Sequence, residues 1–396
     1  MRSIAILSLL LLVFIPGASA TPIDGGERRD RLEINSAVLG ETRQIIVHLP
    51  DGYQEDTGRT YPVLYLTDAE WQFDLIAATM DYHAEWGRIP GHIVVGLFNP
   101  ERNADLVPVN DPRYPGTGNG DAYLEHVNDE VLPLINERYR TSEVRLLFGH
   151  SFGGVMVLNQ LLTGPGAFDG YIALGASTWV SDRVLFDRLD AVDQDFGGAA
   201  LYMAVGETDG GATVPDGELF AERLEALNPQ GLDWVFEIRP GENHFTNVPE
   251  GLHRAIAFLY PFADQQTELT ETGREGGAHA VRHWFAQKEA ELGWRFHPQS
   301  MELSLAGFTL GMEGEIDTAL ALFDELQRRF PENVEVVAVS ANALGAAQRF
   351  TAAITEIDRA IEMAEEYGHP DSRIEAFRAF RGRLVSRMEA AAQDGN

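Results

Sequence analysis

Short apolar runs rich in β-branched and aromatic residues alternate with longer amphipathic runs between Arg31 and Tyr260. One short run, Tyr61 to Leu66, is almost continuously apolar, which is typical of a strand buried on both faces of a sheet. Regular alternation of strands and helices is the pattern of repeated βαβ units, which build a largely parallel sheet. The sequence therefore predicts a doubly wound α/β domain. The expected strands are Gln44 to Leu49, Tyr61 to Leu66, His92 to Phe98, Val144 to Phe148, Tyr171 to Leu174, Leu201 to Val205 and Trp234 to Ile238.

The character of the sequence changes after Phe262. The polar segment 264–277 is interpreted as a linker, and helical periodicity replaces the strand signals beyond it. Four residues recur 34 positions later with similar size: Gly307 as Ala341, Leu310 as Leu344, Ala319 as Ala353 and Phe323 as Ile357. This period is typical of tetratricopeptide repeats, although a third copy fails at Glu375. We predict a small all-α domain with tetratricopeptide-like repeats over residues 278–396; a generic helical bundle is the alternative.

The N-terminus has the organisation of a secretory signal peptide. Arg2 precedes an apolar run from Ile4 to Ile15, and the small residues Ala18, Ser19 and Ala20 follow. The apolar run is shorter than the roughly 20 residues that cross a bilayer. We therefore expect a cleaved signal peptide over residues 1–20, an α/β domain over 21–263, no membrane span, and a periplasmic or secreted protein.

Composition excludes several classes of function. The chain has 61 acidic and 30 basic residues and a formal net charge of −31, which disfavours binding to nucleic acid or anionic lipid. It has no cysteine, so thiol catalysis and thiolate metal sites are excluded. Phosphate loops, dinucleotide fingerprints and metal-ligand histidine spacings are absent from the sequence, and we expect no cofactor and no metal.

The hexapeptide GHSFGG, residues 149–154, has the GxSxG pattern. It directly follows an expected strand and directly precedes an apolar helix, which is the context of a nucleophile elbow. A serine on this sharp turn projects its hydroxyl away from the sheet, and glycines on either side avoid clashes. The sequence predicts that Ser151 is the nucleophile and that the backbone N–H of Phe152 stabilises an oxyanion.

A serine hydroxyl needs a general base, and the base is a histidine held by a carboxylate. In this architecture the chain order is serine, acid, histidine. His244 lies in a polar loop directly after an expected strand, where ligand sites gather in α/β sheets, and is predicted to be the base. His150 is discounted as the base, because adjacent residues on an elbow point in different directions.

The acid is expected on the loop after the strand Leu201 to Val205. This loop holds two carboxylates, Glu207 and Asp209. Asp209 lies deeper in the loop and precedes two glycines that free its backbone to turn, so it is preferred, with Glu207 as the alternative. The second oxyanion donor is expected from the loop after Leu66, which begins at Thr67.

At these motifs the chain resembles the esterase-D-like esterases of the α/β-hydrolase superfamily, which include enterochelin-type siderophore esterases, feruloyl esterases and mycolyltransferases. The resemblance spans residues 33–262. It rests on LPDGY (49–53), YPVLYLTDAEWQF (61–73), VVGLFNPERNADLVP (94–108), GHSFGG (149–154) and GENHF (241–245).

The resemblance implies roles for further residues. The second oxyanion N–H carries over onto Glu70, although this chain has Thr67, Asp68 and Ala69 where the family usually has LDG. Arg102 is implied to lie beside the site in a structural ion pair with Asp105, and it is a candidate substrate contact. Trp179 is implied to line the acyl or alcohol pocket.

Together these features predict an exported serine hydrolase that cleaves small-molecule carboxylic esters through an acyl-enzyme. A siderophore lactone, a plant phenolic ester and a simple short-chain ester all satisfy the triad. Two alternatives stay open: an acyltransferase that uses the same triad, and a scaffold protein that binds a partner through its C-terminal helices.

Overall fold

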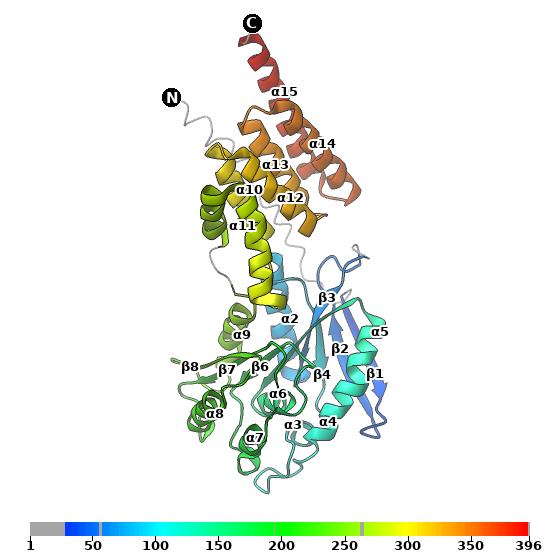
Figure 1. The fold of residues 1–396 in the computed structure, drawn as a ribbon. Coiled ribbons are helices and arrows are strands. Elements are labelled where there is room, and N and C mark those ends of the chain that lie inside the picture. Colours follow the sequence, from blue (N-terminus) through cyan, green and yellow to red (C-terminus); the bar gives the residue numbers. More distant parts are fainter. Residues whose placement is uncertain (1–27, 55–57, 194, 262–264, 395–396) are drawn as a thin grey trace. The chain divides into compact units, whose positions relative to one another are not determined.

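The computed structural model describes residues 28–54, 58–193, 195–261 and 265–394. The chain divides after Pro261 into two compact units. The first contains the sheet and its helices, and the second is helical (Figure 1). The predicted signal peptide, residues 1–20, lies outside the described residues. In the part of the chain that is described, no helix is both long and apolar enough to cross a membrane.

The first unit is built on an eight-stranded sheet in the order β1-β2-β4-β3-β5-β6-β7-β8. The strands are β1 Arg29–Asn35, β2 Thr42–His48, β3 Tyr61–Leu66, β4 Ile93–Leu97, β5 Thr141–His150, β6 Gly170–Leu174, β7 Ala199–Gly206 and β8 Leu232–Arg239. The pairs β1–β2 and β2–β4 are antiparallel, and every other pair is parallel. All residues of β3, β4, β6 and β7 are buried, which explains their continuous apolar sequences.

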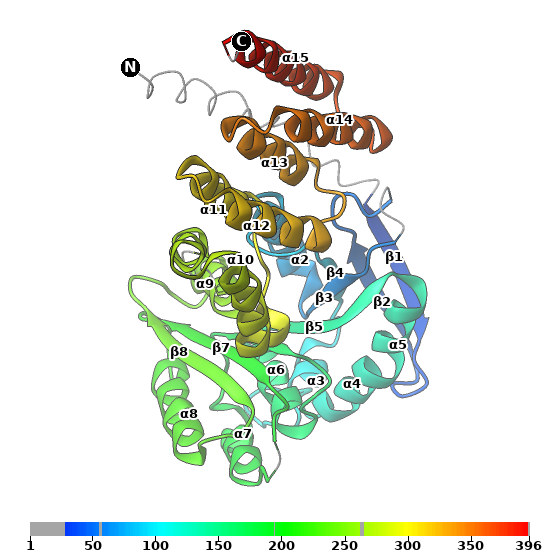
Figure 2. The same cartoon turned by 45° about the horizontal axis from the view of Figure 1, so that its top comes forward.

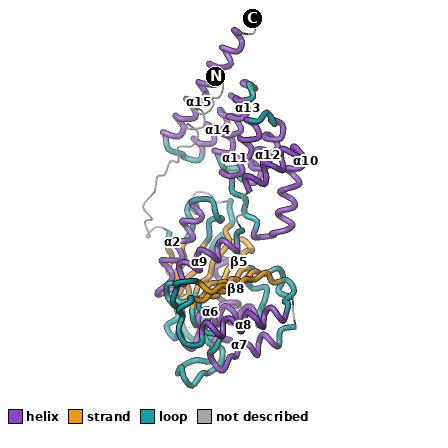
Figure 3. Tube along the Cα trace, turned by 90° about the vertical axis from the view of Figure 1, so that its left-hand side faces the viewer, coloured by secondary structure: helices purple, strands orange, loops and turns teal. Residues whose placement is uncertain are grey.

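Helices cover both faces of this sheet. They are α2 Ala69–Glu85, α3 Arg102–Leu106, α4 Gly120–His126, α5 Leu132–Arg138, α6 Phe152–Thr163, α7 Val180–Asp190, α8 Thr213–Leu227 and α9 Asn247–Leu259, with a π-helical turn η1 at Val127–Val131. Helices α2 and α9 lie on one face, and α6, α7 and α8 lie on the other (Figure 3). The expected doubly wound, mostly parallel α/β fold is confirmed. The first strand, β1, and helix α7 had no clear signal in the sequence.

The second unit contains only helices among its described residues. They are α10 Gln265–Leu292, a short 3₁₀ turn η2 at Gly293–Arg295, α11 Ser300–Met312, α12 Ile316–Arg329, α13 Val334–Ala346, α14 Phe350–Glu366 and α15 Asp371–Asp394. Consecutive helices from α11 to α15 pack side by side (Figure 2). Helix α13 begins 34 residues after α11, and α14 begins 34 residues after α12. The all-α character is confirmed, whereas the assignment of these pairs as tetratricopeptide repeats stays a prediction.

The segment interpreted as a linker is helical from Gln265 onward and forms the first part of α10. One of its glycines is required by packing, because a Cβ on Gly273 would lie 2.8 Å from Leu310 Cδ1. Gly277 has a φ of 61° and interrupts the helix. The sequence alone does not distinguish Gly273, which allows a neighbouring helix to pack closely, from Gly277, which interrupts the helix. For this reason segment 264–277 was interpreted as a linker.

Candidate active site

Ser151 occupies a sharp turn between β5 and α6, with φ 61° and ψ −117°. A left-handed φ is unusual for serine and marks backbone strain of the kind found at functional sites. The glycines of GHSFGG are sterically required: a Cβ on Gly149 would overlap the Gly153 carbonyl, and a Cβ on Gly154 would lie 2.8 Å from the Ala176 Cβ. The motif thus has the geometry of a nucleophile elbow, and the side chain of Ser151 is partly exposed.

The predicted base and acid are in contact. His244 Nδ1 lies 3.0 Å from Asp209 Oδ1 and 2.9 Å from Asp209 Oδ2. Because a carboxylate only accepts hydrogen bonds, Nδ1 carries the proton and Nε2 of the neutral ring is free to accept one. The Asp209 side chain is 2% exposed and that of His244 is 26% exposed. The carboxylate therefore holds the imidazole from its buried side, in the tautomer that a general base requires.

Glu207, the alternative acid, has a different partner. Its carboxylate accepts a hydrogen bond of 2.9 Å from the backbone N–H of Gly241 and lies in an exposed part of the loop. It helps to fold the loop that carries His244. The geometry favours Asp209 as the acid.

The side chain of His150, the residue before Ser151, joins the elbow to the loop that carries His244. The His150 imidazole is hydrogen-bonded through Nε2 to the backbone carbonyl of His244 at 2.7 Å, and the two rings are 4.5 Å apart. Among the described residues, no hydrogen bond joins the Ser151 hydroxyl to His244. Hydrogen bonds between nucleophile and base are often long before substrate binds. The structure thus brings the loops of the two residues together and leaves their side chains unbonded.

The two expected oxyanion donors lie at the first turns of two helices. Phe152 begins α6, and Glu70 is the second residue of α2, so their N–H groups belong to helix ends where backbone donors lack intrahelical partners. The parallel strands β3 and β5 bring both ends to one edge of the sheet. A Cβ on Gly153 would overlap the Thr67 hydroxyl, so the two turns touch.

The expected ion pair between Arg102 and Asp105 is wrong. Arg102 instead binds Asp68 with two hydrogen bonds of 2.7 and 2.9 Å. Asp105 is fully buried and is held by Arg43 of β2 through two bonds of 2.7 Å. The two residues of α3 thus face different partners, since Asp105 points into the core and Arg102 points toward the elbow. Arg102 also lies 5.5 Å from the ring of Trp71.

The sequence analysis did not single out Asn99, which connects these groups. Its side-chain oxygen accepts a 2.9 Å bond from the Asp68 N–H, and its amide donates to Asp105 Oδ2 at 3.2 Å. Its backbone N–H donates to Glu70 Oε1 at 2.9 Å. The loop before α2 is therefore fixed to the buried Arg43–Asp105 pair through one asparagine. The only sequence signal was its position at the end of an expected strand, within a family-like motif.

Burial shifts the pKa values of two groups at this site, Asp68 and His150. Burial raises the pKa of the Asp68 carboxyl, and the hydrogen bonds from Arg102 oppose that rise. Burial, with a further contribution from His244, lowers the pKa of His150 to about 4. His150 is therefore neutral at ordinary pH.

Trp179 lies beside the elbow, and its role in lining the acyl or alcohol pocket stays a prediction. Its ring is 6.5 Å from that of Phe152 and 5.4 Å from that of Tyr114, and its indole N–H donates to Thr213 Oγ1 at 3.3 Å. Tyr114 in turn contacts Phe152 edge to face at 5.4 Å. Tyr114 is a member of this aromatic wall that sequence reasoning missed.

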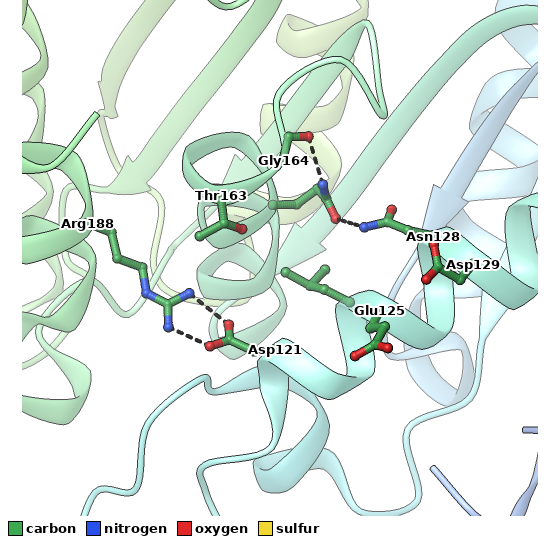
Figure 4. Close-up of a pocket in the computed structure, with 9 residues that line it drawn as sticks. Asp121, Glu125, Asn128, Asp129, Thr163, Gly164 and Arg188 are labelled. Atoms are coloured by element: carbon green, nitrogen blue, oxygen red, sulfur yellow. Dashed lines mark hydrogen bonds and ion pairs between the residues drawn. The ribbon is translucent and has the colours of Figure 1, made fainter. Parts of the chain in front are cut away.

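A separate cavity of about 530 Å³ lies at the far end of α6 (Figure 4). It is lined by Asp121, Leu124, Glu125, Asn128, Asp129, Gln160, Thr163, Gly164 and Arg188. Arg188 neutralises Asp121 through hydrogen bonds of 2.7 Å. The carboxylates of Glu125 and Asp129 also line the cavity but do not contact Arg188 (Figure 4). No group of three or more potential metal ligands occurs in the described residues. This cavity contains none of the predicted site residues.

Comparisons with known proteins find similarity to esterases. Residues 36–228 match the model of a family described as "Putative esterase". The match covers just under half of the chain, which is therefore similar to this esterase family along that segment. The sheet, the elbow and the Asp209–His244 pair all lie in the unit that ends at Pro261, and the match covers most of that unit.

Individual proteins similar to this chain are named for their activities. Ferri-bacillibactin esterase BesA of Bacillus subtilis is 28% identical over 232 residues, covering 51% of this chain and 80% of the relative. The siderophore triacetylfusarinine C esterase of Aspergillus fumigatus is 32% identical over 159 residues, covering 35% of this chain and 53% of the relative, so the match spans about half of that protein. A solved IroE-like serine hydrolase from Shewanella oneidensis is 26% identical with a TM-score of 0.62, covering 76% of this chain and 99% of the other. These similarities support an ester hydrolase.

Proposed function

We propose that this protein is an exported serine hydrolase that cleaves carboxylic esters through Ser151, His244 and Asp209. The observation that carries the proposal is the Asp209–His244 pair, with contacts of 2.9 and 3.0 Å, on a loop that is hydrogen-bonded to the residue before Ser151. Ser151 and His244 are 93 positions apart in the chain with Asp209 between them, and the three follow β5, β7 and β8 in the order serine, acid, histidine.

The chemistry follows from these positions. His244 Nε2 takes the proton of the Ser151 hydroxyl as the oxygen attacks the ester carbonyl carbon. The N–H groups of Phe152 and Glu70 stabilise the negative charge on the carbonyl oxygen of the tetrahedral intermediate. The imidazolium, stabilised by Asp209, then gives its proton to the departing alcohol, and an acyl-enzyme forms. Water attacks this ester with His244 again as the base, and the carboxylic acid leaves.

A siderophore-type ester is the proposed substrate class. It is supported by two relatives that are named as esterases of ferri-bacillibactin and triacetylfusarinine C. The wall formed by Trp179 and Tyr114 offers flat apolar surface beside the elbow. Arg102 is 22% exposed in its pair with Asp68 and is proposed to face the same space. Export is proposed from the sequence of residues 1–20.

The test is hydrolysis by the Ser151→Ala variant. With p-nitrophenyl acetate as substrate, we expect a loss of about 10⁴-fold or more in kcat and an unchanged circular dichroism spectrum. A panel of esters of increasing acyl length, together with a ferric siderophore lactone, then ranks substrates by kcat/KM. Retention of most of the activity by the alanine variant contradicts the nucleophile assignment, and a kcat/KM for the lactone no higher than for simple esters contradicts the substrate class.

A further inference from the structure

The His150 side chain is buried in the middle of the site, yet the proposed mechanism gives it no step. Its residue is 4% exposed and ends β5, directly before Ser151. Its backbone carbonyl faces the Arg102 guanidinium at 3.5 Å, and its ring packs 4.5 Å from that of His244 and 6.1 Å from that of Phe245. A buried imidazole at this position needs an explanation beyond filling space.

The direction of its hydrogen bond is fixed by chemistry. The partner of Nε2 is the backbone carbonyl of His244, and a carbonyl oxygen only accepts. Nε2 therefore carries the proton, and the neutral ring has no second N–H to donate. His150 cannot act as a proton relay to Ser151 while it makes this bond, so its contribution is structural.

The loop that it binds is exposed, and its other hydrogen bonds run within the loop or to the loop after β7. Gly241, Asn243, Phe245 and Thr246 are all exposed, and Phe245 is 75% exposed. On one side the loop is tied to the β7 loop, through Thr208 N–H to the Glu242 carbonyl at 2.9 Å and through Asp209 to the His244 ring. On the side of the elbow, the loop is held by the His150 hydrogen bond, which joins positions 94 residues apart.

We propose that His150 is a positioning residue, which holds the backbone of the catalytic base at a fixed distance from the nucleophile that follows it in sequence. This inference rests on the proposed function of Ser151 and His244. Proton transfer requires the serine oxygen and the imidazole nitrogen to approach to about 2.6–3.2 Å. A displacement of about 1 Å in such a pair costs about 100-fold in rate. One hydrogen bond from the residue next to the nucleophile to the backbone of the base restrains this distance directly.

Two polar variants separate positioning from simple burial. His150→Gln keeps an N–H donor near the position of Nε2, whereas the shorter His150→Asn keeps the amide but does not reach the His244 carbonyl. We expect His150→Asn to lower kcat for p-nitrophenyl acetate by about 10- to 100-fold with KM within about 2-fold, and His150→Gln to recover most of the loss. His150→Leu, which has no donor, should match His150→Asn.

A matched control is His92, which lies at the amino end of β4, whereas His150 lies at the carboxyl end of β5. His92 is 2% exposed, precedes β4, and is hydrogen-bonded to the Pro90 carbonyl and the Tyr260 hydroxyl. His92→Leu should reduce thermal stability as much as His150→Leu and leave kcat within about 2-fold of the parent.

The outcomes distinguish this inference from the proposed function. If Ser151→Ala is inactive while His150→Asn and His150→Leu keep parental kcat, the positioning role is wrong and the esterase mechanism stands. The role is also wrong if His150→Gln is as slow as His150→Asn, or if the loss of kcat merely follows the fraction of unfolded protein. Activity in Ser151→Ala would instead contradict the proposed function itself.

Discussion

Asp209 contacts the His244 ring with both carboxylate oxygens, at 3.0 and 2.9 Å from Nδ1. The carboxylate is almost fully buried, while the ring that it holds is a quarter exposed. A buried carboxylate that faces one ring nitrogen orients the imidazole and stabilises its protonated form. This relationship is the basis of the first prediction.

Replacing Asp209 by asparagine removes the negative charge and allows the ring to adopt the wrong tautomer. We expect kcat for p-nitrophenyl acetate to fall by about 10³- to 10⁴-fold. Glu207→Gln is the matched control, because it neutralises a carboxylate on the same loop and keeps an oxygen for the Gly241 N–H. Its kcat should stay within about 3-fold of the parent. Equal losses in the two variants would contradict the assignment of Asp209.

The buried pair of Arg43 and Asp105 should make a large contribution to stability. Asp105→Asn leaves the Arg43 guanidinium, which is 4% exposed, with only the half-exposed Glu41 as a charge partner. We expect a loss of up to about 3–5 kcal/mol in the free energy of unfolding of the sheet unit. Asp190→Asn is the control, since its pair with Arg223 is half exposed on both sides. Urea denaturation followed at the transition of the sheet unit measures both. Similar losses of unfolding free energy in the two variants would show that burial of the Arg43–Asp105 pair does not increase its contribution to stability.

Stability of the sheet unit should fall as the solution becomes mildly acidic. Burial lowers the pKa of His150 to about 4, and burial with the neighbouring His253 lowers the pKa of His83. The unfolded chain therefore binds more protons than the folded chain below about pH 6.5, so this stability is present above pH 6.5 and is lost toward pH 4. His150 contributes at most about 3 kcal/mol of this loss.

Thermal unfolding between pH 7.5 and pH 4.5 checks this sign. The parent should melt at lower temperature as the pH decreases, and His83→Asn, which cannot titrate at this position, should show a smaller decrease. Burial is the main reason that the charged form of His83 is disfavoured, and His253, whose ring centroid lies 5.2 Å away, adds to it. A melting temperature that rises toward pH 4.5 would contradict the predicted sign.

Local sequence predicted the elbow well, because the strand, the glycines and the helix of residues 144–162 are adjacent in the chain and fix one another. The fold class followed from the apolar runs, since buried parallel strands need continuous apolar sequence. His244 and Asp209 could be selected because parallel strands bring the ends of β7 and β8 to one edge of the sheet.

Partners that depend on three-dimensional packing could not be predicted in the same way. Arg102 and Asp105 are three residues apart on one short helix, yet each binds a residue more than 30 positions away. The contact of His150 with the His244 backbone also depends on how two distant loops meet. The discounting of His150 as a base agrees with this geometry, but its hydrogen bond had no sequence signal.

Covalent labelling with a fluorophosphonate tests the central claim most directly, because the reagent reports an activated serine independently of substrate identity. We predict that intact-protein mass spectrometry shows one adduct per chain, that peptide mapping assigns it to Ser151, and that His244→Ala labels at least about 100-fold more slowly. Labelling of another serine, or equal labelling of the Ser151→Ala variant, would contradict the account.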